Sequence, residues 1–113
     1  MQIKSKSLII NGIIFGALLC TLPAAAVEVI QMKIKGHVFE PAEISIPANT
    51  KVKLHIHNQD ASPEEFESHS MHREKLIPGG SKRIIYIGPL DAGSYEFFGE
   101  FNPKTAQGRV IVK

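Results

Sequence analysis

Apolar and polar residues alternate along much of this 113-residue chain, and the alternation predicts short β-strands. Segments 27–35 and 51–57 place aliphatic side chains at every second position. Successive side chains of a strand point to opposite faces, so each segment is expected to bury one face. In the second segment the polar face carries His55 and His57, which we therefore expect on the surface of the sheet. The sequence brings no third ligand to this pair, so a metal site is not expected there.

Further strands are predicted at intervals of about ten residues. They cover segments 43–47, 81–87, 94–99 and 108–113. Turns rich in glycine and proline, 78–80 and 88–93, separate these strands, and no segment has the period of a long helix. About six or seven short strands of this kind predict an all-β fold, a Greek-key antiparallel β-sandwich.

The N-terminal segment 1–26 is expected to be a cleaved secretion signal rather than part of the fold. Lys4 and Lys6 precede an apolar stretch over 8–22, and small residues at 23–26 place the cleavage after Ala26. The apolar stretch has about 15 residues, fewer than the ~20 that span a bilayer. We therefore predict a signal peptide over 1–26, a single domain over 27–113, and no membrane span after cleavage.

The chain has a single cysteine, Cys20, and it lies within the predicted signal. A lipoprotein would be acylated at such a cysteine, but that cleavage requires a small preceding residue and Leu19 is large. Loss of Cys20 on export is therefore the favoured interpretation. The remaining domain has neither a disulfide nor a thiolate, and one hydrophobic core must stabilise it.

The charge of the predicted domain is balanced. Two of the 13 basic residues and none of the 11 acidic residues lie in 1–26, so 11 of each sign remain and the formal charge is zero. A nucleic-acid partner therefore has no electrostatic support.

Segment 62–75 concentrates the groups that bind metals. Its potential ligands are Glu64, Glu65, Glu67, His69, Met71, His72 and Glu74. Ser62 and Pro63 form a helix start, whereas the apolar spacing that follows suits an extended chain better, so both structures stay open. A strand aligns residues 65, 67, 69 and 71, and a helix groups residues 67, 71 and 74. Glu67 and Met71 share a face in either case.

A second short stretch, 98–103, contributes Glu100, and we expect the two stretches to meet in the fold. Two carboxylates about 4 Å apart repel by about 4 kcal/mol at an effective dielectric constant of 20, so a converging cluster attracts a cation. Oxygen and imidazole ligands suit Cu(II), iron or manganese. The alternative is a solvated acidic edge beside Arg73, Lys75 and neighbouring basic residues.

Three motifs give the chain a resemblance to the cupredoxins. They are His37-x-Phe39-x-Pro41-x-x-Ile44-x-Ile46-Pro47-Ala48, Val52-x-Leu54-x-Ile56-x-Asn58-x-Asp60 and Gly88-Pro89-Leu90-x-x-Gly93-x-Tyr95-x-Phe97. The resemblance implies a two-sheet sandwich with its metal at one end, between the loop after Asn58 and the loop after Phe97.

A fourth motif resembles a narrower group, the small periplasmic cupredoxin-like proteins of bacterial ferrous-iron permease systems. It is Phe97-Phe98-Gly99-Glu100-Phe101-x-Pro103-x-Thr105-Ala106-x-Gly108. This resemblance implies a periplasmic location, copper or iron as the bound ion, and an inner-membrane iron permease or a periplasmic iron-binding protein as partner.

The chain departs from the blue-copper cupredoxins at the ligand positions themselves. Gly99 stands at the cysteine position, Asn102 at a histidine position, and Glu64 after Pro63 at the upstream histidine position. A type-1 copper centre needs a thiolate and two imidazoles, so this centre is not expected.

The expected function is periplasmic binding of copper or iron as an accessory to iron uptake or metal handling. The expected ligand set is Glu67, Glu74, Glu100, His69, Met71, Glu64 and His72. The alternative is a metal-free structural or docking module of a transport complex that keeps the cupredoxin sandwich. No feature of the sequence establishes enzymatic turnover, and Fe(II) oxidation would require bound copper.

Overall fold

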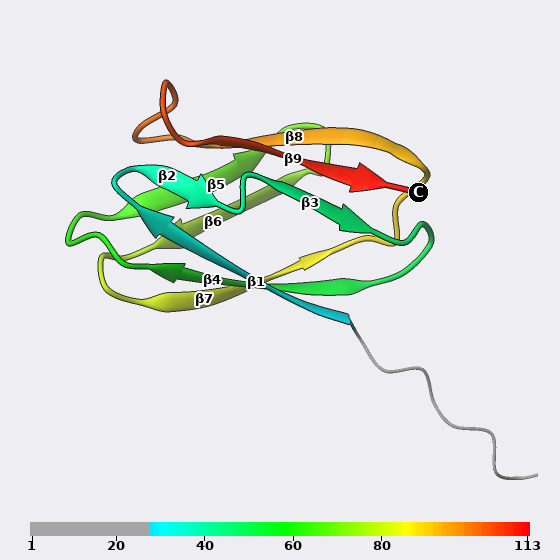
Figure 1. Ribbon diagram of the computed structural model, residues 1–113, viewed down its shortest axis with the longest axis horizontal. Helices are drawn as coiled ribbons and strands as arrows, with labels where there is room; N and C mark the ends of the chain where they lie inside the picture. The colour runs from blue at the N-terminus through cyan, green and yellow to red at the C-terminus, as the bar shows by residue number, and fades with distance from the viewer. Residues whose placement is uncertain (1–27) are drawn as a thin grey trace, which may run out of the picture.

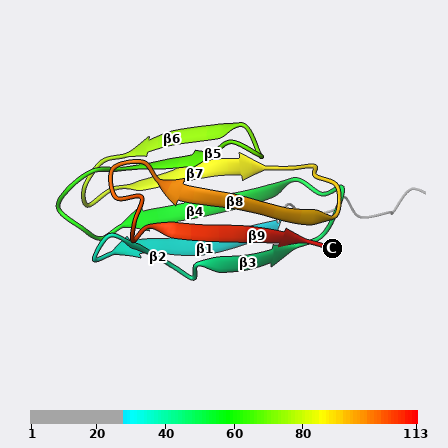
Figure 2. The ribbon, with the colours of Figure 1, turned by 90° about the horizontal axis from the view of Figure 1, so that it is seen from above.

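Two β-sheets packed face to face form the part of the chain that the computed structural model describes, residues 28–113 (Figures 1 and 2). One sheet has the order β2-β1-β4-β7 and the other the order β3-β9-β8-β5-β6. The strands are β1 (Glu28–Lys35), β2 (Val38–Glu40), β3 (Glu43–Ile46), β4 (Val52–Asn58), β5 (Glu64–Ser68), β6 (Arg73–Ile77), β7 (Lys82–Ile87), β8 (Gly93–Gly99) and β9 (Gln107–Val112). The predicted all-β sandwich is confirmed.

The predicted signal peptide 1–26, with Cys20, lies outside the described residues. Between residues 28 and 113 the chain forms no helix of the length and hydrophobicity that crossing a membrane requires.

The strand pairing is mixed, which differs from the purely antiparallel pattern predicted from the sequence. β1 runs parallel to β4, and β3 runs parallel to β9, whereas the other pairs are antiparallel. A parallel pair needs a long crossover connection, and here the chain passes through β2 and β3 before it returns as β4. Alternation of side chains is the same in both pairings, so the sequence pattern does not distinguish them.

The core forms where the inner faces of the two sheets meet. The alternation predicted for β4 is confirmed, since Val52, Leu54 and Ile56 are fully buried. The inner face of β8 contributes Phe97, which stacks on Phe66 of β5 at a centroid distance of 4.9 Å. Aromatic and aliphatic burial of this kind is the main stabilising contribution available to a domain without a disulfide.

Segment 62–75 is a β-hairpin, and this resolves the helix-or-strand alternative left open by the sequence. β5 and β6 pair antiparallel with Glu67 opposite Glu74. The connecting turn spans residues 69–72, where the His72 amide donates to the His69 carbonyl at 3.3 Å and His72 has a positive φ of 55°. The sequence pattern did not reveal β6, because as an edge strand it buries only Ile77 completely.

Candidate metal site

The two ligand-bearing stretches meet because β5 and β8 are neighbours in the five-stranded sheet. Phe66 pairs with Gly99 and Glu67 with Phe98. One residue further on, the Glu100 amide donates to the Glu65 carbonyl at 2.8 Å. The predicted meeting of the two stretches is therefore confirmed.

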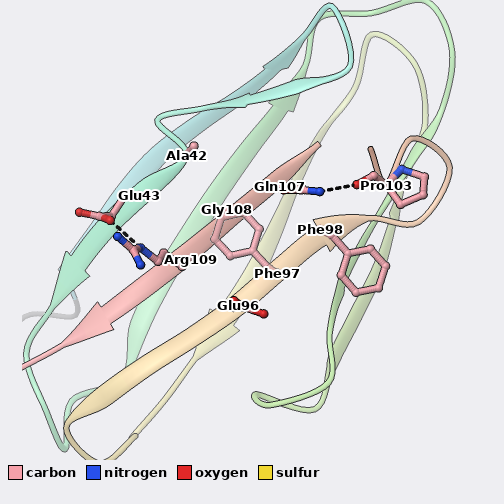
Figure 3. A pocket seen from close by; sticks show the side chains of 9 residues that line it. All are labelled: Ala42, Glu43, Glu96, Phe97, Phe98, Pro103, Gln107, Gly108 and Arg109. Carbon is pink, nitrogen blue, oxygen red and sulfur yellow. Dashed lines mark hydrogen bonds and ion pairs between the residues drawn. The ribbon is translucent and has the colours of Figure 1, made fainter. Parts of the chain in front are cut away.

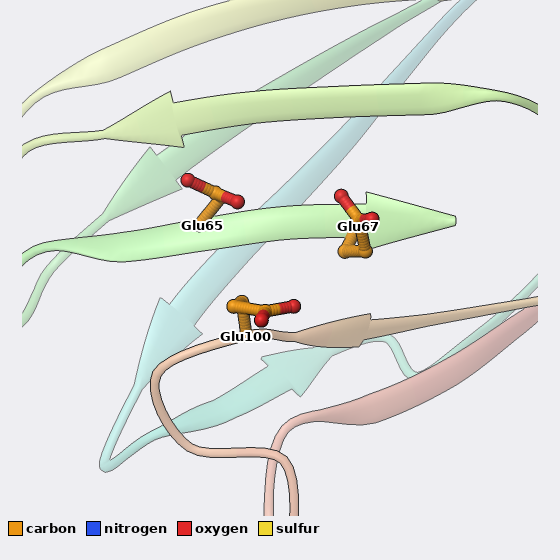
Figure 4. A group of neighbouring side chains, drawn as sticks. All are labelled: Glu65, Glu67 and Glu100. Atoms are coloured by element: carbon orange, nitrogen blue, oxygen red, sulfur yellow. The ribbon is translucent and has the colours of Figure 1, made fainter. Parts of the chain in front are cut away.

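Three carboxylates gather on the outer face of this sheet, and we call Glu65, Glu67 and Glu100 the carboxylate cluster (Figure 4). One oxygen from each lies within 4.8 Å of the others. Glu67 is the most enclosed, with a side chain 16% exposed, and its Oε2 is shielded from solvent without a hydrogen-bond partner. A shielded carboxylate oxygen with no donor beside two further carboxylates is an arrangement that a cation would stabilise.

Glu65 is one of the potential ligands of segment 62–75, but it is absent from the ligand set that the sequence analysis expects. Its signal was present, since residues two apart on a strand share a face and Glu65 stands two positions before Glu67. The helical alternative groups residues 67, 71 and 74 instead, so Glu65 is not common to the two structures that the sequence leaves open.

Glu74 and His69 border the carboxylate cluster. Glu74 lies opposite Glu67 across the β5–β6 pair. The His69 ring is mostly exposed, and its Nδ1 lies 3.6 Å from Glu67 Oε1. A hollow of about 360 Å³ lies beside them, and its lining residues are Glu67, Ser68, His69, His72, Arg73 and Glu74.

The pKa of Glu65 is raised above its usual range, because its side chain shares a hydrogen bond with Glu74 and, to a smaller extent, because of desolvation and the neighbouring negative charges. A carboxyl group with a raised folded-state pKa stabilises the fold at low pH. This contribution is lost as the pH rises through the raised pKa, so ionised Glu65 destabilises the fold at neutral pH relative to low pH.

Replacing Glu65 by glutamine, which keeps the shape of the protonated acid, is therefore expected to raise the Tm at pH 7 in metal-free protein. At pH 4, where the wild-type carboxyl already binds its proton, the gain should shrink. Thermal unfolding followed by circular dichroism across this pH range measures the difference. The control is Glu96→Gln, an exposed change on the same face outside the cluster. A gain at Glu65 that is independent of pH would contradict the hydrogen bond between Glu65 and Glu74 that raises the Glu65 pKa.

Glu64 lies on the opposite face of β5 from the cluster and is 1% exposed. Its Oε1 accepts hydrogen bonds from the Phe101 amide at 2.9 Å and the Glu65 amide at 3.0 Å. Its Oε2 accepts a hydrogen bond from Asn102 Nδ2 at 2.7 Å. The structure thus separates Glu64 from the other carboxylates and satisfies it with protein donors; we call Glu64 and Asn102 the buried plug.

The two residues of the buried plug, together with Gly99, stand at the three positions where the resemblance to blue-copper cupredoxins places copper ligands. A Cβ added at Gly99 would lie 2.5 Å from the Glu64 carboxyl carbon and 2.7 Å from the Ala106 Cβ. Atoms do not approach so closely, so even the first carbon of a cysteine side chain has no room. The residues present do not fit a thiolate-ligated copper.

Met71 and His72 take positions that the strand interpretation did not anticipate. β5 ends at Ser68, and the chain then turns, so that Met71 packs in the hydrophobic core at 4% exposure instead of continuing the face of Glu67. Its amide donates to Ser68 Oγ at 3.3 Å. His72 is exposed and lines the hollow beside Glu67.

A larger hollow, of about 590 Å³, lies over β3, β9 and β8 (Figure 3). Two of its charged groups bind each other, because Arg109 Nε donates to Glu43 Oε1 at 2.7 Å, and Glu96 is the third charged group in its lining. Gln107 Nε2 likewise donates to the Pro103 carbonyl at 3.0 Å. This hollow therefore offers fewer free ligands than the carboxylate cluster.

Comparison with known protein families shows to which family the chain belongs. The model of the Cupredoxin-like domain family matches residues 8–112, so the chain belongs to this family. An uncharacterized protein of Rickettsia prowazekii (strain Madrid E) is 46% identical over 83 residues, which are 74% of this chain and 66% of that protein. The chain thus spans slightly less than two thirds of the length of this relative.

Solved structures share the fold at low sequence identity. The metal-binding domain of the Cu(I)-exporting P-type ATPase CopA of Streptococcus pneumoniae, solved with Cu(I), aligns with a TM-score of 0.70 at 17% identity over 81% of this chain and 91% of that one. The blue copper protein auracyanin A of Chloroflexus aurantiacus aligns with a TM-score of 0.67 at 13% identity over 78% of this chain and all of that one. Amicyanin of Paracoccus versutus gives 0.58 at 22% identity over 82% and 86%.

Proposed function

We propose that the domain binds a copper or iron ion through the carboxylate cluster, with Glu74 and His69 as further ligands. The observation that carries this proposal is the convergence of three carboxylate oxygens within 4.8 Å around a shielded, unpartnered Glu67 oxygen. A bound cation would offset the mutual repulsion of the carboxylates and supply the partner that this oxygen lacks.

The ligand chemistry favours an ion that accepts hard ligands. Carboxylate oxygens with one imidazole suit Cu(II), iron or manganese, whereas Cu(I) prefers thiolate and thioether sulfur. Met71 is held in the core and Glu64 in the buried plug, so neither belongs to the proposed set. Copper is supported by the copper proteins that share the fold, and iron by the resemblance of the segment from Phe97 to Gly108 to iron-uptake proteins.

In the cell this site would act in the periplasm as an accessory to metal handling. The expected partners are an inner-membrane iron permease or a periplasmic iron-binding protein. The sequence resemblance and the predicted signal peptide support this part of the proposal.

Removing two of the central ligands is expected to weaken binding strongly. In a calorimetric titration of the metal-free domain with Cu(II), and anaerobically with Fe(II), the Glu67→Gln, Glu100→Gln double variant should bind about 100-fold more weakly than wild type, because two charged ligands are lost. The matched control is Glu43→Gln with Glu96→Gln, which removes the same charge from the same sheet face outside the cluster. Equal weakening in both variants would show that general negative charge, and not this site, attracts the metal.

A metal-free docking module is the second candidate function, and the buried plug favours it. The Glu64–Asn102 hydrogen bond closes the end of the sandwich where cupredoxins with type-1 copper hold their metal. Saturable binding that depends on Glu67 separates the first candidate from the second. Absence of saturable binding of either ion would leave the docking module as the better account.

A further inference from the structure

The outer face of the four-stranded sheet carries basic side chains along its whole length. We call this surface the basic face; its residues are Lys33, Lys35, Lys51, Lys53, His55, His57 and Lys82. Strand register arranges them in rows, with Lys33, His57 and Lys82 side by side across β1, β4 and β7. On this face the described strands carry one carboxylate, Glu40, whose Oε2 lies 3.4 Å from Lys33 Nζ.

Charge is segregated between the two sides of the domain. The basic surface continues around the β7 edge through Arg73, Lys75 and Arg83, so that it holds eight of the 11 basic residues in 28–113. The outer face of the other sheet holds the carboxylate cluster together with Glu43, Glu74 and Glu96. A domain without net charge therefore has one strongly basic and one strongly acidic side.

Exposed apolar groups lie among the lysines of the basic face. Val29, Ile84 and Tyr86 are 47%, 42% and 44% exposed. The Tyr86 ring lies under two ammonium groups, with Lys51 Nζ at 4.8 Å and Lys53 Nζ at 5.8 Å from its centroid. Lysines with long flexible stems around an amphipathic aromatic ring are typical of surfaces that lie at the boundary between headgroups and acyl chains.

We propose that the basic face docks on the surface of an anionic lipid bilayer. This inference does not depend on the proposed metal function. A broad sheet face with lysines at both of its ends matches a bilayer, which presents negative charge over a plane without a fixed pattern. Docking in this orientation turns the carboxylate cluster away from the lipid and leaves it accessible.

A second copy of the chain is the competing occupant, because its acidic side complements the basic face. Such a contact would be head-to-tail and would generate rings or open chains of molecules. It would also cover the carboxylate cluster of each following copy. A bilayer leaves the carboxylate cluster uncovered, and the experiment separates the two occupants.

The test is co-sedimentation of the domain with vesicles of phosphatidylcholine containing about 30% phosphatidylglycerol, compared with vesicles of phosphatidylcholine alone. Binding is expected only to the anionic vesicles and should fall at least tenfold when the salt is raised from about 0.05 M to about 0.5 M. Adsorption to both kinds of vesicle, or to neither, would overturn the proposal.

Charge-reversal substitutions test whether the basic face makes the contact with the vesicle. Lys51→Glu with Lys82→Glu is expected to weaken vesicle binding at least about 25-fold, because each lysine near an anionic membrane contributes about fivefold. The matched control reverses two exposed lysines elsewhere, Lys104→Glu with Lys113→Glu, and should retain binding within a few-fold. Circular dichroism checks that both variants fold.

Two results would contradict the assignment of the basic face. Equal losses in the two double variants would show a response to net charge alone. Salt-sensitive self-association of the wild type in sedimentation velocity, without vesicle binding, would assign the face to a second copy.

Discussion

Replacing Glu64 by alanine is expected to lower the free energy of unfolding by about 2–4 kcal/mol, because each buried polar group left without a partner costs about 1–3 kcal/mol. The carboxylate accepts hydrogen bonds from the Phe101 amide, the Glu65 amide and Asn102 Nδ2, and all three lose their acceptor. Urea unfolding followed by circular dichroism measures the change. A loss below about 0.5 kcal/mol would show that water replaces the carboxylate and that the end of the sandwich is open.

A paired substitution tests the hydrogen-bond pattern of the buried plug directly. Glutamine alone at position 64 keeps the oxygen that accepts from the two backbone amides, but it turns an NH₂ group toward the NH₂ group of Asn102. Adding Asn102→Asp supplies an acceptor there and should restore most of the stability lost by Glu64→Gln. In the double-mutant cycle, additive losses would contradict the direct contact.

Replacing Phe97 by alanine is expected to cost about 3–5 kcal/mol, the usual range for an aromatic residue removed from a core. Phe97 stacks on Phe66 at 4.9 Å and meets Phe39 edge to face at 5.1 Å, so the cavity would open between the sheets. Gly108 lies directly against the same ring, and a Cβ there would come within 2.4 Å of it. Total stabilities of small domains are about 5–15 kcal/mol, so a large fraction of the variant should be unfolded near 50 °C.

The control for this prediction is the next residue along the strand. Phe98 points to the outer face, where it lies beside His69 at a centroid distance of 5.5 Å. Phe98→Ala is therefore expected to cost no more than about 1 kcal/mol. Comparable losses at positions 97 and 98 would contradict the assignment of inner and outer faces to β8.

The sequence pattern predicted most of the fold because alternation reports burial directly. β1, β3 and β7 lie within segments expected to be strands, and β4, β8 and β9 each extend one residue beyond theirs. The β5–β6 hairpin was not assigned, since charged residues fill its outer face and its helix-start signal at Ser62 and Pro63 competed with the extended form. Neighbouring strands in space supply the backbone hydrogen bonds that override this local preference.

The candidate site was predicted in part, and the reason lies in the two faces of β5. Glu64 and Glu67 belong to the same acidic segment, yet an odd spacing puts Glu64 inside and Glu67 outside. The resemblance to the cupredoxins implies that Glu64 stands where a ligand histidine is usual. The structure adds that the Glu64 carboxylate accepts a hydrogen bond from Asn102. The two residues are 38 positions apart in the sequence, so no local pattern reveals this contact.

The positions of Glu64 and Glu67 distinguish two sites: the end of the sandwich and the carboxylate cluster on its outer face. The end of the sandwich is closed by the buried plug, whereas the free carboxylates lie on the outer face of β5 and at the end of β8. The proposed metal site is therefore displaced from the position that the family resemblance alone would suggest.

Paramagnetic line broadening tests this location most directly. Sub-stoichiometric Cu(II) is added to isotope-labelled domain, and the loss of intensity of each backbone amide is recorded by NMR. The proposal predicts that the amides of residues 65–67, 74 and 98–100 broaden first and that Glu67→Gln abolishes the effect. Broadening centred on His55 and His57 of the basic face, or on His37, would contradict a metal site at the carboxylate cluster.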